Sequence, residues 1–374
     1  MAHQSLLSHD YYFSEDAFQK EKRALFQSGE ADIFIGHTSM APTRSDYCVL
    51  PHTKNGKFIR NDGEKFSLID NICRHRHALM LEGRGKAERI VCPIHMWSYD
   101  GEGALVKSPG IECDKATHSL ECETLDTAHG FLIKKGDKRL KQSLQAAHEF
   151  TDLDFKKLYF LGAESSTNTT NWKDYIETFL ELYHVDAYHP GLRGMVDCNR
   201  LQNRFGDRWH LQAVEARDIS LRNSSKKIAE FITLYEQEVG AFDNGFGAIW
   251  LTIYPNILIE IYGKFAVFAH VIPHGPSSYS VHKYTFCDPS LIGRDDLIAE
   301  FGTFMNQVEV EDLDLIQKIH DGRRLMFERG DPHIGPVHPT KEDGQLYFHD
   351  YLREKAYGYQ ESGIRDRKIK AIKF

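Results

Sequence analysis

The sequence has few cysteines and no apolar run long enough to cross a membrane. No segment approaches about 18 uninterrupted apolar residues, and the first ten residues lack the basic start and apolar stretch of a signal peptide. Its 7 cysteines are scattered over 374 residues, unlike the dense spacing of a secreted disulfide framework. We therefore expect a cytoplasmic protein without a membrane partner.

The sequence also lacks an excess of positive charge. Lys and Arg number 46 against 54 Asp and Glu, a formal net charge of −8. Because nucleic-acid binding needs basic groups that neutralise phosphates, we expect no nucleic-acid partner. There is also no glycine-rich dinucleotide fingerprint and no four-cysteine ferredoxin spacing. Electrons for any redox reaction must therefore come from another protein.

The chain is long enough for two domains, and its patterning changes along its length. Helix formers fill 14–28, whereas short alternating stretches broken by turn residues between 43 and 136 indicate a small β domain. Long apolar strands between 247 and 287, followed by a helix over about 294–325, predict an antiparallel sheet covered by helices. The predicted class is α+β. The expected parts are an N-terminal helix packing on the catalytic domain (1–40), a β domain (41–140) and a catalytic domain (141–374).

Two short Cys/His pairs stand out in the β domain. Cys73 and His75 are followed, after 16 residues, by Cys92 and His95, a C-x-H…C-x2-H pattern. Two thiolates and two imidazoles are the ligand set of a Rieske [2Fe–2S] cluster. A structural zinc site is the alternative, but zinc modules usually pair cysteine with cysteine and histidine with histidine. Mixed pairs favour the cluster, and His77 is interpreted as a loop residue outside the ligand set.

A second constellation lies in 171–185, which we predict to be a helix. There Glu177, Glu181 and His184 fall at spacings of four and three, on one helix face, and His189 follows. Two imidazoles joined by one carboxylate form the 2-His-1-carboxylate site of iron(II) oxygenases. The preceding Ser/Thr/Asn-rich stretch 165–170 is predicted to be a turn.

The carboxylate must come from the second half, and spacing alone does not identify it. An acidic helix start at 309–314 offers four acids that could each reach inward, although acids at a helix start also simply complement the dipole. The candidates are Glu309, Glu311, Asp312 and Asp314.

Around these residues the sequence resembles Rieske non-haem iron oxygenases. The resemblance covers the loops 73–79 (CRHRHAL) and 92–103 (CPIHMWSYDGEG), and the catalytic motifs around 171–190 and 311–313. It is closest in style to the carnitine and choline monooxygenase branch. The family commonly has glycine where His77 and Met96 stand here.

The resemblance implies roles that spacing leaves open. It selects Asp312 as the third iron ligand beside His184 and His189, with Asp314 as the alternative. It makes Glu181 a bridge to His95 of a neighbouring subunit, and so implies a head-to-tail homotrimer. The implied cofactors are a [2Fe–2S] cluster, mononuclear Fe(II) and O2, with electrons from NAD(P)H through a separate flavin/iron–sulfur reductase or ferredoxin. The basic segment 365–374 could dock such a donor, although a solvated terminus is the simpler interpretation.

Because Glu181 and its neighbouring motif resemble the branch that acts on non-aromatic substrates, the resemblance implies hydroxylation of an aliphatic C–H in a small organic substrate, either an amine or a secondary-metabolite intermediate. An aromatic-ring hydroxylating dioxygenase is the alternative enzyme. A non-catalytic electron-transfer protein, or a zinc-bound structural one, is the alternative of another class. Candidate pocket walls are Leu192, Met195, Val196 and inward residues of the strands at 250–262 and 265–270.

Overall fold

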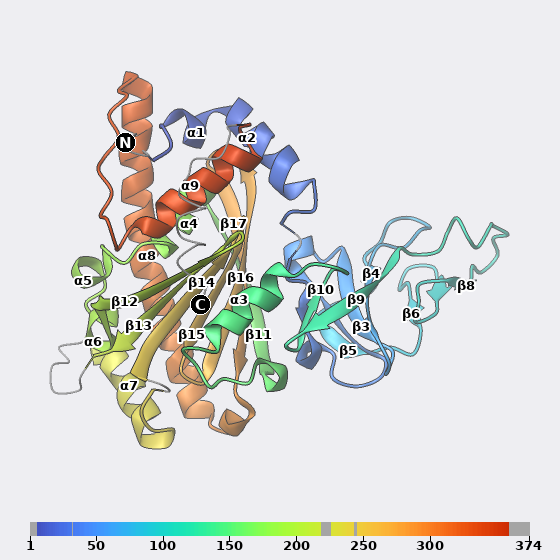
Figure 1. Cartoon of the computed structure of the whole chain (residues 1–374). Helices are drawn as coiled ribbons and strands as arrows, with labels where there is room; N and C mark the ends of the chain where they lie inside the picture. The colour runs from blue at the N-terminus through green and yellow to red at the C-terminus, as the bar shows by residue number, and fades with distance from the viewer. Residues whose placement is uncertain (1–5, 32, 218–225, 243–244, 359–374) are drawn as a thin grey trace.

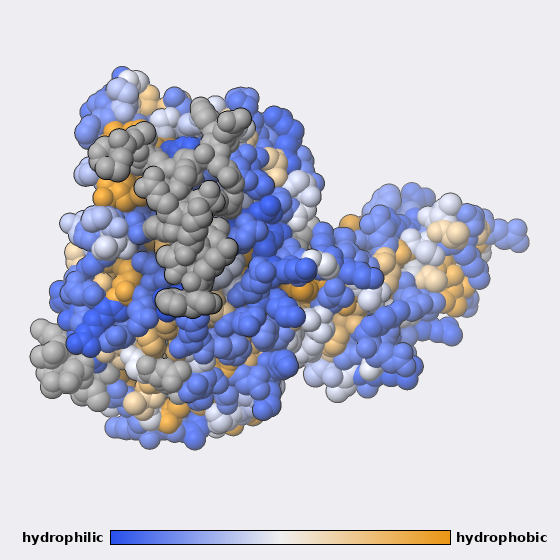
Figure 2. All heavy atoms as spheres, viewed as in Figure 1, coloured by the Kyte–Doolittle hydropathy of each residue, from blue (hydrophilic) through white to orange (hydrophobic). Residues whose placement is uncertain are grey.

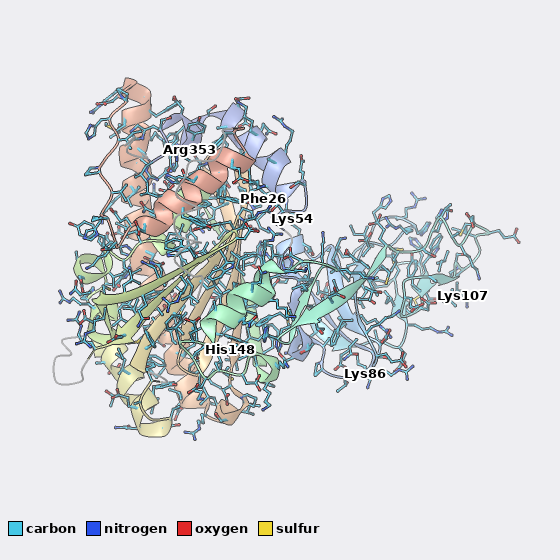
Figure 3. All side chains as sticks on the ribbon, viewed as in Figure 1. Phe26, Lys54, Lys86, Lys107, His148 and Arg353 are labelled. Carbon is cyan, nitrogen blue, oxygen red and sulfur yellow. The ribbon has the colours of Figure 1, made fainter. Side chains whose placement is uncertain are left out.

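The computed structural model describes residues 6–31, 33–217, 226–242 and 245–358, and it forms a large body with a smaller lobe (Figure 1). The basic segment 365–374 lies outside the described residues. Lys107 marks the distal part of the lobe in Figure 3, and Arg353 marks the body. None of the described helices is apolar over a length that would cross a bilayer.

The lobe consists of antiparallel strands, as the alternating pattern predicts. Its larger sheet has the order β1-β10-β9-β4-β3-β2-β5, and β6-β7-β8 form a small second sheet. The strands are β1 (Gly36–His37), β2 (Asp46–Val49), β3 (Lys57–Asn61), β4 (Phe66–Asp70), β5 (Arg84–Lys86), β6 (Ile90–Val91), β7 (Ser98–Tyr99), β8 (Leu105–Lys107), β9 (Cys122–Ala128) and β10 (Phe131–Ile133).

The body is built on a seven-stranded antiparallel sheet, which confirms the α+β class. Its strand order is β11-β17-β16-β15-β14-β13-β12. The strands are β11 (Tyr159–Asn168), β12 (Val196–Gly206), β13 (Trp209–Ala216), β14 (Phe246–Ile253), β15 (Ile257–Tyr262), β16 (Phe265–Gly275) and β17 (Ser278–Cys287). The helices around it are α3 (Arg139–Ala147), α4 (Trp172–Phe179), α5 (Val185–Tyr188), α6 (Leu192–Met195), α7 (Lys226–Glu238), α8 (Asp295–Arg329) and α9 (Asp343–Lys355).

Both faces of this sheet are buried. Successive residues of a strand point to opposite faces, so Ile249 and Leu251 join the core on the α3 side, whereas Trp250 joins the core beneath α8. α3 packs on β13 and β14, and the expected boundary at residue 140 falls inside it. The sheet therefore carries one face toward α3 and the lobe, and the other toward α7 and α8.

The N-terminal helices pack on the body through a buried network of charges. α1 (Asp10–Phe13) and α2 (Glu15–Glu21) precede a π-helical turn, Lys22–Phe26. Glu21 pairs with Lys173 of α4 at 2.6 Å, with both side chains only 1% exposed. Removing one partner of such a pair leaves an uncompensated buried charge, which costs about 3–5 kcal/mol. The Glu21–Lys173 pair therefore makes the N-terminal helices an integral part of the body.

A second part of the network joins α4 to α8. Arg323 of α8 pairs with Asp174 and, at 2.7 Å, with Glu177, and His349 of α9 contacts Glu177 at 2.9 Å. Burial opposes ionisation of Glu177, yet the Arg323 and His349 charges lower its pKa to about 2. The helix that precedes the iron-site motif is thus held to the helix that carries Asp312.

Two local predictions differ from the structure. Residues 165–168, predicted to be a turn, belong to β11, because pairing with Val281 and its neighbours on β17 satisfies their backbone. The predicted helix 171–185 is α4, which ends at Phe179, and the short α5. The Glu181 carboxylate accepts the N–H groups of Tyr183 and His184, and this local bonding competes with helix continuation.

Candidate metal centres and active-site cavity

The two Cys/His pairs lie in loops with the same backbone geometry. In each loop the N–H four residues after the cysteine donates to its carbonyl, from His77 to Cys73 at 3.0 Å and from Met96 to Cys92 at 3.1 Å. His77 and Met96 both adopt the left-handed region, with φ of 61° and 60°. This conformation favours glycine, which explains why glycine is common in the resembling family at these positions.

The four predicted cluster ligands are brought together. The Cys73 and Cys92 thiols are buried, and the rings of His75 and His95 lie 4.6 Å apart. His75 Nδ1 is buried without a hydrogen-bond partner among the described residues. A buried nitrogen of this kind is what a metal ligand leaves when its ion is removed. The His77 side chain is exposed.

Tyr99 adds a contact to which sequence reasoning gave no role. Its hydroxyl lies 3.6 Å from Cys73 Sγ and accepts the Arg74 N–H at 3.0 Å. Burial raises the pKa of Tyr99 above its ordinary value, so the hydroxyl stays protonated and can donate to the sulfur. Hydrogen bonds to ligand sulfurs raise the potential of iron–sulfur clusters.

The second predicted set converges at one point beside α5 and α8. His189 Nε2 lies 2.9 Å from Asp312 Oδ1 and 3.1 Å from His184 Nε2. A search of the described residues for His, Cys, Asp and Glu that could share one metal ion finds this group, and its ligand atoms all lie within 4.8 Å of one another. Two neutral imidazoles and a carboxylate in this arrangement suit iron(II).

The electrostatics of this site favour a cation. Burial opposes protonation of His184, but hydrogen bonds to Asp312 and Glu181 outweigh it and raise its pKa to about 9. Burial likewise opposes ionisation of Asp312, but both histidines outweigh it and lower its pKa to about 2. A divalent ion would replace the protons that these groups otherwise share.

The structure separates the four acids that spacing alone could not. Glu311 accepts a hydrogen bond from His189 Nδ1 at 2.8 Å and so orients that ring. Glu309 pairs with Lys283 at 2.9 Å. The exposed Asp314 turns to Tyr188 and Lys318. Only Asp312 of the four points at the two imidazole Nε2 atoms.

Glu181 contacts the outer nitrogen of the first histidine. Its Oε1 lies 2.5 Å from His184 Nδ1, and its side chain is 9% exposed. Glu177, which we predicted on the same helix face, points instead to Arg323 and His349. Because α4 ends between the two acids, the helical spacing no longer aligns them.

A cavity of about 60 Å³ opens onto the three converging residues. Of the predicted walls, Leu192, Trp250, Glu260 and Tyr262 line it, whereas Met195 and Val196 are buried in the core beneath α8. Residues 265–270 do not line this cavity. Sequence reasoning missed walls from elements distant in the chain, namely Tyr175, Lys283, Met305 and Val308.

The cluster loops present apolar side chains to solvent. Leu79, Ile94 and Met96 are 47%, 61% and 60% exposed. Figure 2 shows hydrophobic side chains on the otherwise polar surface of the lobe. Exposed apolar groups beside a predicted redox centre are typical of a surface that contacts another protein.

Comparison with known proteins agrees with this arrangement. Residues 46–125 match the Rieske [2Fe-2S] domain, and residues 155–357 match the ring hydroxylating alpha subunit catalytic domain. Putrescine 2-hydroxylase of Ralstonia nicotianae is 33% identical over 348 residues, covering 91% of this chain and 93% of the relative. The carnitine monooxygenase oxygenase subunit of Escherichia coli K12 is 24% identical, covering 92% of each.

Solved structures share the fold. A quaternary ammonium Rieske monooxygenase in complex with L-carnitine has a TM-score of 0.71 at 19% identity, covering 94% of this chain and 96% of that one. Naphthalene 1,2-dioxygenase with bound indole has a TM-score of 0.69 at 18% identity, covering 97% and 94%.

The chain therefore belongs to the Rieske oxygenase alpha-subunit family. It is an O2-dependent oxidoreductase of the monooxygenase type, which uses a [2Fe–2S] cluster and a mononuclear iron. As in the rest of the family, a small molecule is its substrate and a separate protein supplies its electrons.

Proposed function

We propose that this enzyme hydroxylates an aliphatic C–H of a small amine. Iron would be held by His184, His189 and Asp312, and the cluster by the Cys73/His75 and Cys92/His95 pairs. When bound, the iron supplies O2 activation and the cluster supplies electrons one at a time. The observation that carries the proposal is the triad opening onto a cavity with acidic and aromatic walls. The names of the relatives, hydroxylases and monooxygenases of amines, support the substrate class.

The residues around the triad hold the imidazoles in one orientation. Glu311 accepts from His189 Nδ1, and its other oxygen accepts the Gln307 amide at 2.7 Å. Glu181 contacts His184 Nδ1 in the same way. Both carboxylates leave the Nε2 atoms free to face Asp312 and fix the tautomer that a metal needs. The apolar walls limit water around the reacting C–H.

Electrons are proposed to cross between subunits. The second cluster loop follows β6 at the far end of the lobe, whereas α5 lies on the opposite side of the body (Figure 1). In a head-to-tail homotrimer, His95 of one protomer would meet Glu181 of the next, and the carboxylate would link it to His184. A flavin/iron–sulfur reductase or ferredoxin is the proposed donor, using NAD(P)H.

The first test combines spectroscopy with product analysis. Protein reduced anaerobically should give a Rieske-type paramagnetic resonance signal and contain about three irons per chain. Exposure to labelled O2 with putrescine or carnitine should yield a product carrying one labelled oxygen atom. Incorporation of two atoms into an aromatic probe would favour the dioxygenase alternative. A zinc-loaded protein without the signal would overturn both metal assignments.

The inter-subunit route has its own test. Chains with Asp312→Ala lack an iron ligand and chains with Cys92→Ser lack a cluster ligand, so each alone should form no product. Differently tagged and co-expressed, they should form mixed trimers with partial activity, because an intact cluster faces an intact iron site across one interface. Inactive mixed trimers would rule out this route. Glu181→Gln should leave the cluster reducible but slow its reoxidation.

A further inference from the structure

An acidic residue lies at the centre of the large sheet, on the face that borders the active-site cavity. Glu260 belongs to β15, where its direct cross-strand neighbours are Trp250 of β14 and Val267 of β16. Its side chain lines the same cavity as His184, His189 and Asp312. Neither cross-strand neighbour is a cation, although an interior carboxylate normally needs one.

Glu260 has a hydrogen bond but no salt-bridge partner among the described residues. Its Oε2 accepts the Tyr262 hydroxyl at 2.8 Å, and Tyr262 in turn accepts the Trp250 indole N–H at 3.0 Å. No salt bridge to Glu260 occurs within the described part of the chain. Lys283, a cation on the cavity wall, makes its ion pair with Glu309 at 2.9 Å. Burial raises the pKa of Glu260 to about 6 against the opposing charge of Lys283.

The charges on the cavity wall are therefore unequally matched. Asp312 faces the two histidines, and Glu309 is neutralised by Lys283. Glu260 makes no salt bridge among the described residues and lies near apolar groups such as Met305 and Val308, and the charge of Lys283 offsets it only in part. A small molecule with an apolar chain and a positively charged group at one end would complement this wall.

We propose that Glu260 binds the ammonium group of the substrate and selects amines that carry N–H bonds. This inference rests on the proposed amine hydroxylation and assigns the residue that recognises the amine. A carboxylate oxygen accepts a strong charge-assisted hydrogen bond from a primary ammonium. A quaternary ammonium has no N–H to donate and depends on aromatic faces alone. Glu260 is thus a specificity residue that excludes permanently methylated amines.

The test measures equilibrium binding to the iron-loaded holoenzyme without O2. The probes are n-butylamine, its neutral analogue 1-pentanol, and N,N,N-trimethylbutylammonium, titrated by calorimetry. The variants are Glu260→Gln, which keeps the shape and the acceptor for Tyr262, and Glu260→Asp, which keeps the charge. The matched control is Glu164→Gln, which removes the same charge from an exposed strand position in a neighbouring cavity. Iron content and the cluster signal are recorded for each.

Loss of the charge should weaken n-butylamine binding about 10- to 100-fold, the range for a charge-assisted hydrogen bond. Glu260→Asp should recover part of this loss, and Glu164→Gln should bind as the wild type does. Binding of 1-pentanol should be unchanged, and the melting temperature of Glu260→Gln should stay level or rise, because a half-buried charge without a salt bridge is removed. The wild type should bind the trimethylated probe more weakly than n-butylamine.

Different failures have different meanings. Equal n-butylamine affinity in the wild type and Glu260→Gln would overturn the role of Glu260 and leave amine hydroxylation standing. Equal affinity of the wild type for the primary and quaternary probes would overturn the selection for N–H bonds. An equal loss for n-butylamine and 1-pentanol in Glu260→Gln would show a structural role instead. A wild-type holoenzyme that binds no amine would refute the proposed substrate class itself.

Discussion

The two candidate metal centres differ in how the chain assembles them. The Cys73 and Cys92 loops are short, share one backbone pattern and place their histidines near the lobe surface. The proposed iron triad instead joins His184 and His189 to Asp312, more than a hundred positions later on α8. The first centre depends on local turns, whereas the second depends on how two helices pack. Damage to packing should therefore affect the second centre while the first stays intact.

The largest effect should come from the residue that closes the non-local site. Among the described residues, Asp312 is the only carboxylate at the two Nε2 atoms. Asp312→Ala removes it, so the mononuclear iron and product formation should both be lost. The cluster signal should persist, because no cluster ligand is changed. Iron analysis, resonance spectra and product assays measure these outcomes. Asp314→Ala is the control, since Asp314 faces Tyr188 and Lys318. Loss of iron in the control would mean that the acid was assigned wrongly.

The next effect tests the packing that brings the triad together. Arg323→Met leaves Asp174 and Glu177 buried without their shared cation. The body should lose about 3–5 kcal/mol of unfolding free energy, and iron should bind more weakly while the cluster signal remains. Denaturant unfolding and metal titration measure both changes. If the variant lost the cluster and the iron equally, the claim that only the iron centre depends on helix packing would be wrong.

The junction between lobe and body should respond to acid. Burial lowers the pKa of His37 to about 4, although its Nε2 contacts the Phe155 carbonyl. Between pH 6.5 and 4 the unfolded chain gains a proton that the folded chain does not, so stability falls as the pH falls. His37→Gln should reduce this fall by about 3 kcal/mol. Unfolding free energy measured across this range tests it, and an unchanged slope in His37→Gln would contradict it.

The smallest effect concerns the local centre. Met96 has a left-handed backbone beside Cys92. Met96→Gly should relieve about 1 kcal/mol of backbone strain, partly offset by the greater entropy of unfolded glycine. The melting temperature should rise slightly, and the cluster signal should be unchanged. A lower melting temperature would show that the exposed methionine contributes packing that outweighs the strain.

The same contrast explains how much the sequence could predict. The spacing of Cys73 and Cys92 to their histidines predicted a ligand set, and the structure brings these residues together, because such spacing reports local geometry. The choice of Asp312 over Glu311 needed family resemblance. These two acids are consecutive in the sequence, and only the direction in which each side chain leaves α8 separates their roles. The role of Glu260 was missed, because an isolated acid in an apolar strand has no pattern until its neighbours on β14 and β16 are known.

The two chain segments that connect the lobe to the body lie side by side. Gly36 and His37 of β1 pair with Leu132 and Phe131 of β10, while the helices before β1 are locked into the body by Glu21. The lobe is thus a cassette inserted into a body whose two parts are separated in sequence. During synthesis the body can complete its fold only after the cassette has emerged. Exchange of the cassette between relatives would need just two adjacent junctions, so the choice of electron donor could evolve independently of the choice of substrate.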